Sequence, residues 1–359
     1  MPLLAQSTFI DGPSPPPDVT SRPSNETDGD LDVNDTTAAP RGQGANRSRL
    51  RSVAGWLVVA VIFYFIGRSL VANWDELAEA DLHFDVWLLV ASFIILGLWM
   101  VAQAYIWHLL TVSNGAHIPL PKAMAAWFYS QLGKYVPGKV FLYLGRVHLY
   151  NREGRGAGPI TVAFGIEFVG SLAAAVVMVL VAALTSDVPV LDEYRWALVV
   201  ALVAFLVALH PRFIGWAVRL AARALGRQPF EVGFSYPRLL GFVALYVVNW
   251  TLFGVALFVF IRSFYDLDFN SILYLAGAFS LSSIVGILAV FAPSGLGVRE
   301  GVLALFLAPV MPNSVALVVS VGSRLWLTVA ELAAAGIAYS MVRSHQPDES
   351  PSDPGLENP

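Results

Sequence analysis

Charged residues inside otherwise apolar stretches are the first candidates for chemistry in this sequence. Glu167 lies within GPITVAFGIEFVGSLAAAVV, and Arg324 and Glu331 share a long apolar run, seven residues apart and so on nearly one helix face. An ionised side chain in hydrocarbon costs about 2.5–3.5 kcal/mol or more, so it normally faces a bundle interior and has a partner. The three residues therefore predict either a polar cavity that receives a head group or a proton, or structural ion pairs, for example Glu167 with a basic residue near a chain break.

Two apolar segments are interrupted by glycine, proline and basic residues. The first, 119–150, has an apolar piece at about 123–132, a break at GKYVPGK and a second apolar piece at 140–150. The second, 291–312, reads FAPSGLGVREGVLALFLAPVMP, and its apolar piece is too short to cross a membrane core. Glycine permits unusual backbone angles and proline removes a donor, so both segments predict half-helices that dip into the membrane, the second from the cytoplasmic side.

Half-helices expose backbone amides and carbonyls, which are tolerable at membrane depth only beside protein or water. With nearby cations they make a seat for a phosphate group, although a kinked helix with interfacial basic residues is the other interpretation. Two such segments in corresponding places of two halves are typical of a transporter's central site and suggest an inverted repeat. The candidate head-group and cavity residues are Lys134, Tyr135, Pro137, Gly138, Lys139, Arg146, Glu167, Pro293, Gly295, Gly297, Arg299, Glu300, Arg324 and Glu331.

Long hydrophobic helices must position these residues. The chain has 359 residues, 56% hydrophobic and 13% charged, whereas an average soluble domain is about 25% charged. A spanning helix needs about 20 mostly apolar residues, and the alternating short segments of an outer-membrane barrel are absent from the sequence. The sequence predicts an all-α polytopic membrane bundle of about seven spans, with a range of six to eight. The spans are expected at about 53–73, 86–112, 160–185, 195–210, 239–261, 271–292 and 314–342.

Polar tails flank the membrane part. Residues 1–48 are rich in Pro, Ser, Thr, Asp and Asn and predict a disordered cytoplasmic tail, 49–343 form the transmembrane domain, and 344–359 a second disordered tail. Basic and acidic connections alternate, which predicts a multi-pass protein of the cell (plasma or inner) membrane with its N-terminus in the cytoplasm. If the piece near 302–311 is re-entrant, the tail after Arg343 lies outside; if that piece crosses, the tail lies inside.

Motifs of soluble catalysis are missing from the sequence. It contains no Walker A sequence, HExxH, EF-hand loop, paired-histidine spacing or GxSxG elbow, and no cysteine. We therefore expect no catalytic residue, cofactor, metal ion or nucleic-acid partner. Lone polar residues in the spans, such as Gln103, His108 and Asn249, more often make interhelical hydrogen bonds.

Two segments resemble a known family. SQLGKYVPGKVFLYLGR at 130–146 and APSGLGVREGVLALFL at 292–307 resemble the signature segments of the lysylphosphatidylglycerol synthase transmembrane-region family, also called flippase-like, and the resemblance covers about residues 50–343. In the best-known members this region is fused to an aminoacyl-transfer domain and is thought to move the product lipid to the outer leaflet. This chain departs from them in lacking that domain, so the resemblance implies a stand-alone member. By motif position it implies roles for Lys134, Pro137, Gly138, Lys139, Arg146, Pro293, Gly295, Gly297, Arg299 and Glu300.

These observations favour a protein without enzymatic activity that flips a phospholipid or polyprenyl-linked lipid between leaflets. Its cations would attract the lipid phosphate, and its buried glutamates would balance charge or accept a proton. One alternative is a non-transporting membrane scaffold for a separately encoded lipid- or sugar-transferase, and a third is an integral-membrane transferase. The expected partners are membrane lipids with an anionic or lipid-linked head group, with a separate transferase as a further candidate.

Overall fold

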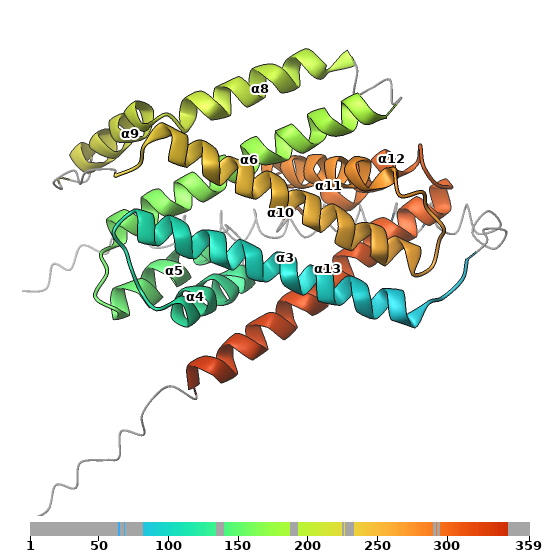
Figure 1. Cartoon of the computed structure of the whole chain (residues 1–359), viewed down its shortest axis with the longest axis horizontal. Coiled ribbons are helices and arrows are strands. Elements are labelled where there is room, and N and C mark those ends of the chain that lie inside the picture. The colour runs from blue at the N-terminus through green and yellow to red at the C-terminus, as the bar shows by residue number, and fades with distance from the viewer. Residues whose placement is uncertain are drawn as a thin grey trace, which may run out of the picture. The chain divides into compact units, whose positions relative to one another are not determined.

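The structure is a computed structural model that describes residues 82–133, 140–186, 193–224, 233–289 and 295–343, with the single residues 64, 68, 226 and 292. In this part of the chain the secondary structure is helical throughout, with no strand (Figure 1). The helices are α3 (Val86–Ser113), α4 (Leu120–Leu132), α5 (Val140–Arg152), α6 (Ala157–Thr185), α8 (Arg195–Ala208), α9 (Pro211–Ala224), α10 (Tyr236–Arg262), α11 (Ser271–Leu288), α12 (Val298–Leu307) and α13 (Asn313–Arg343).

Five described helices, α3, α6, α10, α11 and α13, are long and apolar enough to cross a membrane. They confirm five of the predicted spans, whereas the predicted span at 53–73 lies outside the described residues. The predicted span at 195–210 is α8, whose 14 residues extend only about 21 Å at 1.5 Å per residue. It is bent by 63° from α9, and the two together make at most one further span.

Large apolar side chains cover the outer faces of these helices. Ile94 of α3, Val200 of α8 and Leu332 of α13 are 61%, 59% and 57% exposed. A face of this kind is stable against lipid and costly against water. The described part is therefore an all-α bundle of a multi-pass integral membrane protein.

Contacts at the helix ends define two ends of the bundle. At one, called the Asp85 end, the Asp85 amide donates to the Ser263 carbonyl at 2.8 Å, so α3 begins where α10 finishes. At the other, called the Asn114 end, the Asn114 side-chain amide donates to the Pro159 carbonyl at 2.7 Å, so α3 finishes where α6 begins. The side-by-side courses of α3, α10 and α6 in Figure 1 follow from these contacts.

Helices α6 and α10 run in the same direction. Gly170 of α6 lies against the Tyr246 ring, and further along both helices the Thr251 hydroxyl contacts the Met178 sulfur at 3.7 Å. The chain between them must therefore return from the Asp85 end to the Asn114 end. Helix α8, packed on α6, makes this return and leaves α9 at the Asn114 end.

Helices α4 and α5 form an antiparallel hairpin within the first broken segment. Lys122 near the start of α4 binds Glu153, just past the end of α5, at 2.8 Å. Deeper in the hairpin, Arg146 of α5 donates to the Ser130 hydroxyl of α4 at 2.8 Å. The hairpin therefore opens at the Asn114 end. Its two helices confirm the apolar pieces predicted at 123–132 and 140–150.

Helices α11 and α12 form a second antiparallel hairpin. Gly286 near the end of α11 lies against Arg299 at the start of α12, where a Cβ on the glycine would be 3.1 Å from the arginine Cβ. Near the start of α11, the Tyr274 hydroxyl donates to the Phe306 carbonyl of α12 at 2.5 Å. Because α11 begins just after α10 ends, this hairpin opens at the Asp85 end.

The direction of α12 differs from the sequence expectation, which had both half-helices entering from the cytoplasmic side. Packing of α12 along α11 returns the chain to the Asp85 end, and α13 then starts there and runs along α4 towards the other end (Figure 1). Helix α13 therefore runs towards the Asn114 end, as expected for the alternative in which the 302–311 piece crosses. Two hairpins that enter from opposite ends have the arrangement of inverted-topology repeats.

Small residues bring α11 close to its neighbours. A Cβ on Gly254 of α10 would lie 2.5 Å from the Ala276 Cβ, and one on Gly277 would overlap the Ala182 Cβ of α6. Close backbone approach at small residues is how membrane helices gain packing energy without a hydrophobic driving force between them. The contacts fix α11 against both α6 and α10, beside the first hairpin.

Candidate functional site

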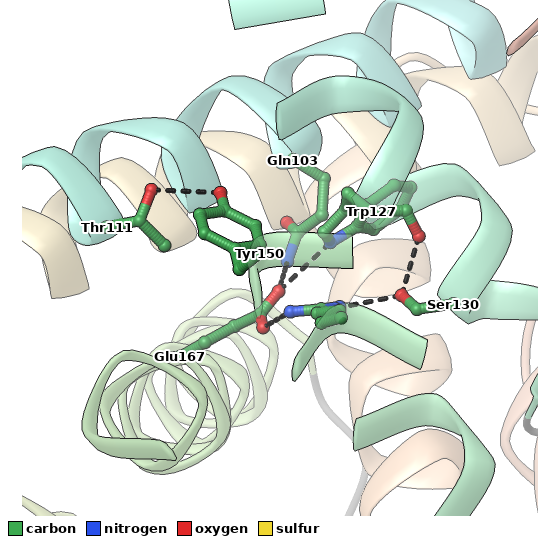
Figure 2. Close-up of polar contacts among 7 residues, drawn as sticks. Gln103, Thr111, Trp127, Ser130, Tyr150 and Glu167 are labelled. Atoms are coloured by element: carbon green, nitrogen blue, oxygen red, sulfur yellow. Dashed lines mark hydrogen bonds and ion pairs between the residues drawn. The ribbon is translucent and has the colours of Figure 1, made fainter. Parts of the chain in front are cut away.

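Arg146 of α5 and Glu167 of α6 form an ion pair inside the bundle (Figure 2). The Arg146 Nη1 donates to Glu167 Oε2, and the two side chains are only 2% and 10% exposed. The Arg146 Nε donates to Ser130 Oγ at 2.8 Å and so ties the pair to α4. Because water screens such charges little at this burial, each holds the other strongly. This is the structural ion pair that the sequence predicts as one interpretation of Glu167.

The second oxygen of Glu167 is also held by neighbouring helices. Trp127 Nε1 of α4 donates to Glu167 Oε1 at 3.1 Å, and Gln103 Nε2 of α3 lies 3.5 Å from the same atom. The side-chain amides of Gln103 and Asn249 lie 2.6 Å apart, which extends the network to α10. The carboxylate thus has a partner from each of three helices, and the predicted interhelical role of Gln103 and Asn249 is confirmed.

Aromatic rings fix the plane of the Arg146 guanidinium. Its carbon lies 4.2 Å from the centroid of the Trp107 ring and 5.4 Å from that of Phe164. A desolvated cation–π contact of this kind contributes about 2 kcal/mol. The Tyr150 ring meets Trp107 edge-on, and its hydroxyl lies 3.1 Å from the Thr111 hydroxyl. The cation is therefore placed by packing as well as by charge.

A cavity of about 180 Å³ borders this ion pair. Its wall combines the ion pair and neutral polar side chains with a larger apolar surface from α3, α4, α5, α6, α10 and α11. The lining residues are Gln103, Gln131, Leu142, Arg146, Phe164, Glu167, Phe168, Ser171, Leu172, Ala175, Trp250, Ser283, Ile284 and Ile287.

A second buried ion pair lies at the other hairpin. Glu300 of α12 and Arg324 of α13 approach to 3.8 Å, with side chains 2% and 9% exposed. The other Glu300 oxygen accepts the Gly297 amide at 2.6 Å, which satisfies a free N–H at the start of α12 and places negative charge at the positive end of the helix dipole. The neighbouring Arg299 guanidinium lies 4.3 Å from the centroid of the Phe279 ring. Charged side chains thus hold the start of α12 through an ion pair, a hydrogen bond and a cation–π contact.

Two glycines make the turn before α12. Gly295 and Gly297 have φ angles of +69° and +81°, which other residues rarely adopt. A Cβ on Gly295 would lie 2.7 Å from the Gly286 carbonyl oxygen and 2.8 Å from its Cα. Glycine is thus required at Gly295 both by backbone angle and by the contact with α11.

The two ion pairs are arranged with opposite polarity. In the first, the hairpin carries the cation and the following span carries the anion; in the second, α12 carries the anion and α13 the cation. Each pair joins a short helix to the next long one, and the two hairpins open at opposite ends. This is a second feature, beside the chain direction, that relates the halves of the bundle.

The predicted site residues fall into separate places. Arg146 and Glu167 line the cavity, whereas the residues of the second broken segment gather around the start of α12 and are not among the lining residues. Glu331, buried on α13, is likewise not part of that wall. The group around α12 comprises Gly295, Gly297, Arg299, Glu300 and Arg324. Outside the described residues lie Lys134, Tyr135, Pro137, Gly138, Lys139 and Pro293.

Several residues of the site carry no signal in the sequence. Trp127 and Ser130 bind the two charges, and Ser171 and Ser283 line the cavity, yet all four are uncharged and common in membrane helices. The spacing of Trp127 and Ser130, three residues apart on α4, places them on one face, but only the tertiary fold directs that face to α5 and α6. Sequence reasoning therefore finds the charges and misses their neutral partners.

A family model described as "Lysylphosphatidylglycerol synthase TM region" matches residues 52–335. The match includes both hairpins, both ion pairs and the whole cavity wall. No curated protein matches the chain.

Proposed function

The chain belongs to the lysylphosphatidylglycerol synthase TM region family, and from this premise we propose that it moves a lipid with a phosphate-bearing head group between the two leaflets of its membrane. The cargo is a phospholipid or a polyprenyl-linked lipid. We propose no catalytic step for the chain itself. A transferase that makes or consumes the lipid would be a separate partner.

The cavity beside the Arg146–Glu167 pair carries the proposal. Ionisable residues at membrane depth are costly, and they mark substrate pathways when they face a cavity within the bundle. Arg146 uses one N–H on Ser130 and one on Glu167, so other N–H groups of its guanidinium can bind a phosphate that enters the cavity. A phosphate oxygen can also take the place of the Glu167 carboxylate, because both are anionic acceptors of the same donor.

The volume of the cavity limits what enters. At about 180 Å³ it is smaller than the ~300–1,000 Å³ sites that enclose drug-sized ligands. It therefore receives a small head group, while the acyl or prenyl chains remain among the exposed apolar faces of the helices. Gln103, Gln131 and Ser283 supply neutral hydrogen-bonding groups along the wall. Such groups contact the uncharged part of a head group without adding net charge.

The charges at the two ends support an orientation in the cell (plasma or inner) membrane. Basic residues outnumber acidic ones at the Asn114 end, and acidic residues outnumber basic ones at the Asp85 end, which by the positive-inside rule supports a cytoplasmic Asn114 end. Together with the span expected at 53–73, it also supports a cytoplasmic N-terminus. Head groups would enter from the cytoplasmic leaflet. The Asn114 end carries the basic residues Lys122, Arg152, Arg155, Arg212, Arg219, Arg223 and Arg238 and the acidic residue Glu153. The Asp85 end carries the acidic residues Asp85, Glu193, Asp266 and Asp268 and the basic residues Arg195 and Arg262.

Reconstitution tests the proposal directly. We expect vesicles that contain the protein to expose inner-leaflet, acyl-labelled NBD-phosphatidylglycerol to external dithionite, so that fluorescence falls well below the half that remains in protein-free vesicles. A labelled glycosphingolipid without phosphate should remain protected, because it offers no anion to Arg146. Equal protection of the phospholipid in vesicles with and without protein would contradict transport.

A further inference from the structure

Helix α9 carries an apolar stripe that the described part of the chain leaves uncovered. Phe213, Trp216 and Leu220 are 46%, 52% and 51% exposed, and no residue of α9 is buried. Their spacing of three and four residues places them on one side of the helix. Ile214 and Val218, on another side, pack against the hydrophobic core. The helix is therefore attached to the bundle through Ile214 and Val218, and its apolar stripe faces outwards.

A row of arginines runs beside this stripe. Arg212, Arg219 and Arg223 are separated by seven and four residues, so they lie on one face, and all three are exposed. Helix α9 contains no acidic residue. Trp216 lies between the arginine row and the rest of the apolar stripe, as the 3.6-residue period requires. The uncovered surface thus changes from apolar through tryptophan to cationic around the helix.

The bend after α8 fixes where α9 lies. The axes of α8 and α9 differ by 63°, and His210 Nδ1 accepts the Arg212 amide at 3.2 Å at the bend. The His210 ring lies 5.0 Å from the ring of Tyr236, in the first turn of α10. Because α10 begins at the Asn114 end, α9 is held at that end, strongly inclined to the helix that leads into it.

We infer that α9 is an interfacial helix that binds the anionic phospholipid surface of the leaflet at the Asn114 end. Its apolar stripe enters the outer acyl region, Trp216 lies at head-group level, and the arginines contact lipid phosphates. Charge complementarity decides the occupant: a second copy packed on the same face would bring two arginine rows together, whereas anionic lipid neutralises them. This inference is independent of lipid transport.

Site-specific labelling tests the inference, because the chain contains no cysteine of its own. Phe213→Cys and Leu220→Cys, with Arg223→Cys as the matched control on the arginine row, would carry an NBD fluorophore on the full chain. The chain would be placed in nanodiscs of phosphatidylcholine, alone or mixed with phosphatidylglycerol. With phosphatidylglycerol present, we expect labels at 213 and 220 to be quenched by nitroxide lipids and shielded from iodide, and the label at 223 to show the reverse.

Removal of the arginines tests the anionic requirement. Arg212→Gln and Arg219→Gln, each added to Phe213→Cys, should lower the ratio of lipid-inserted to water-exposed label about fivefold per arginine, as ~1 kcal/mol per basic residue at an anionic surface implies. Lys122→Gln, at the same end of the bundle, should leave the ratio unchanged. The two arginine variants should keep the melting temperature of the unsubstituted protein.

Three results would overturn the inference. The first is equal iodide quenching at 213, 220 and 223. The second is the same insertion in nanodiscs with and without phosphatidylglycerol, which removes the role of anionic lipid. The third is efficient disulfide formation between copies through the cysteine at 213, which identifies the stripe as a protein interface.

Discussion

Replacing Arg146 by glutamine is expected to lower the free energy of unfolding by about 3–5 kcal/mol, the usual cost of leaving a buried charge without its partner. In Arg146→Gln the buried Glu167 carboxylate would lose its cationic partner and retain the neutral partners Trp127 and Gln103. The guanidinium contact with the Trp107 ring would be lost as well. A thermal melt of the purified protein in detergent measures the effect.

Two controls distinguish the cost of leaving Glu167 unpaired from the cost of losing any basic side chain. Arg146→Gln combined with Glu167→Gln removes both charges and should recover most of the lost stability, because two amides can hydrogen-bond to each other. Lys122→Gln breaks an ion pair of which the side chains are 51% and 30% exposed, and it should cost at most about 1 kcal/mol. If Arg146→Gln melted like Lys122→Gln, the pair would not be the fixed centre of the first hairpin.

Replacing Gly295 by alanine is expected to cost about 2–6 kcal/mol. The positive φ of +69° alone costs a residue with a side chain about 1–3 kcal/mol, and the added Cβ, 2.7 Å from the Gly286 oxygen, adds an overpacking cost of about 1–3 kcal/mol. The backbone of the turn cannot yield without moving Glu300 from Arg324. The same detergent melt measures the loss.

Gly301, six residues further along the chain, supplies a matched control outside that contact. It lies within α12, and a Cβ there would meet nothing within 4 Å. Gly301→Ala should therefore be neutral or stabilise the protein by up to about 1 kcal/mol through helix propensity. Similar melting temperatures for the alanine variants at 295 and 301 would show that the close approach of α11 and α12 does not limit stability.

Hydrophobic length predicts the spans well because lipid imposes it directly. The spans expected at 86–112, 160–185 and 239–261 are the helices Val86–Ser113, Ala157–Thr185 and Tyr236–Arg262. The breaks before α5 and α12 follow from glycine and proline, which act on the backbone locally. Each of these features depends on residues that are close together in the chain, so each can be predicted from the sequence.

Features that depend on packing between distant segments are harder to predict. The sequence indicates that Glu167 pairs with a basic residue near a break, but only the hairpin geometry selects Arg146. The end at which α12 emerges depends on its contact with α11, through Gly286 and Tyr274, which no local pattern encodes. The amphipathic period of α9 is local to PRFIGWAVRLAARA, although no helix is predicted there above, whereas its bend from α8 depends on the contact of His210 with Tyr236.

Filling the cavity is the most direct test of the account that a head group passes beside the Arg146–Glu167 pair. Ser283→Phe places a ring in the cavity wall on α11, and Leu288→Phe places the same ring on the same helix at a side chain that is 72% exposed. We predict that, in reconstituted vesicles, Ser283→Phe lowers the rate of NBD-phosphatidylglycerol movement about tenfold or more, equivalent to ~1.4 kcal/mol or more on the barrier, while Leu288→Phe moves lipid at the unsubstituted rate. Equal rates for the two variants, both folded, would contradict the account.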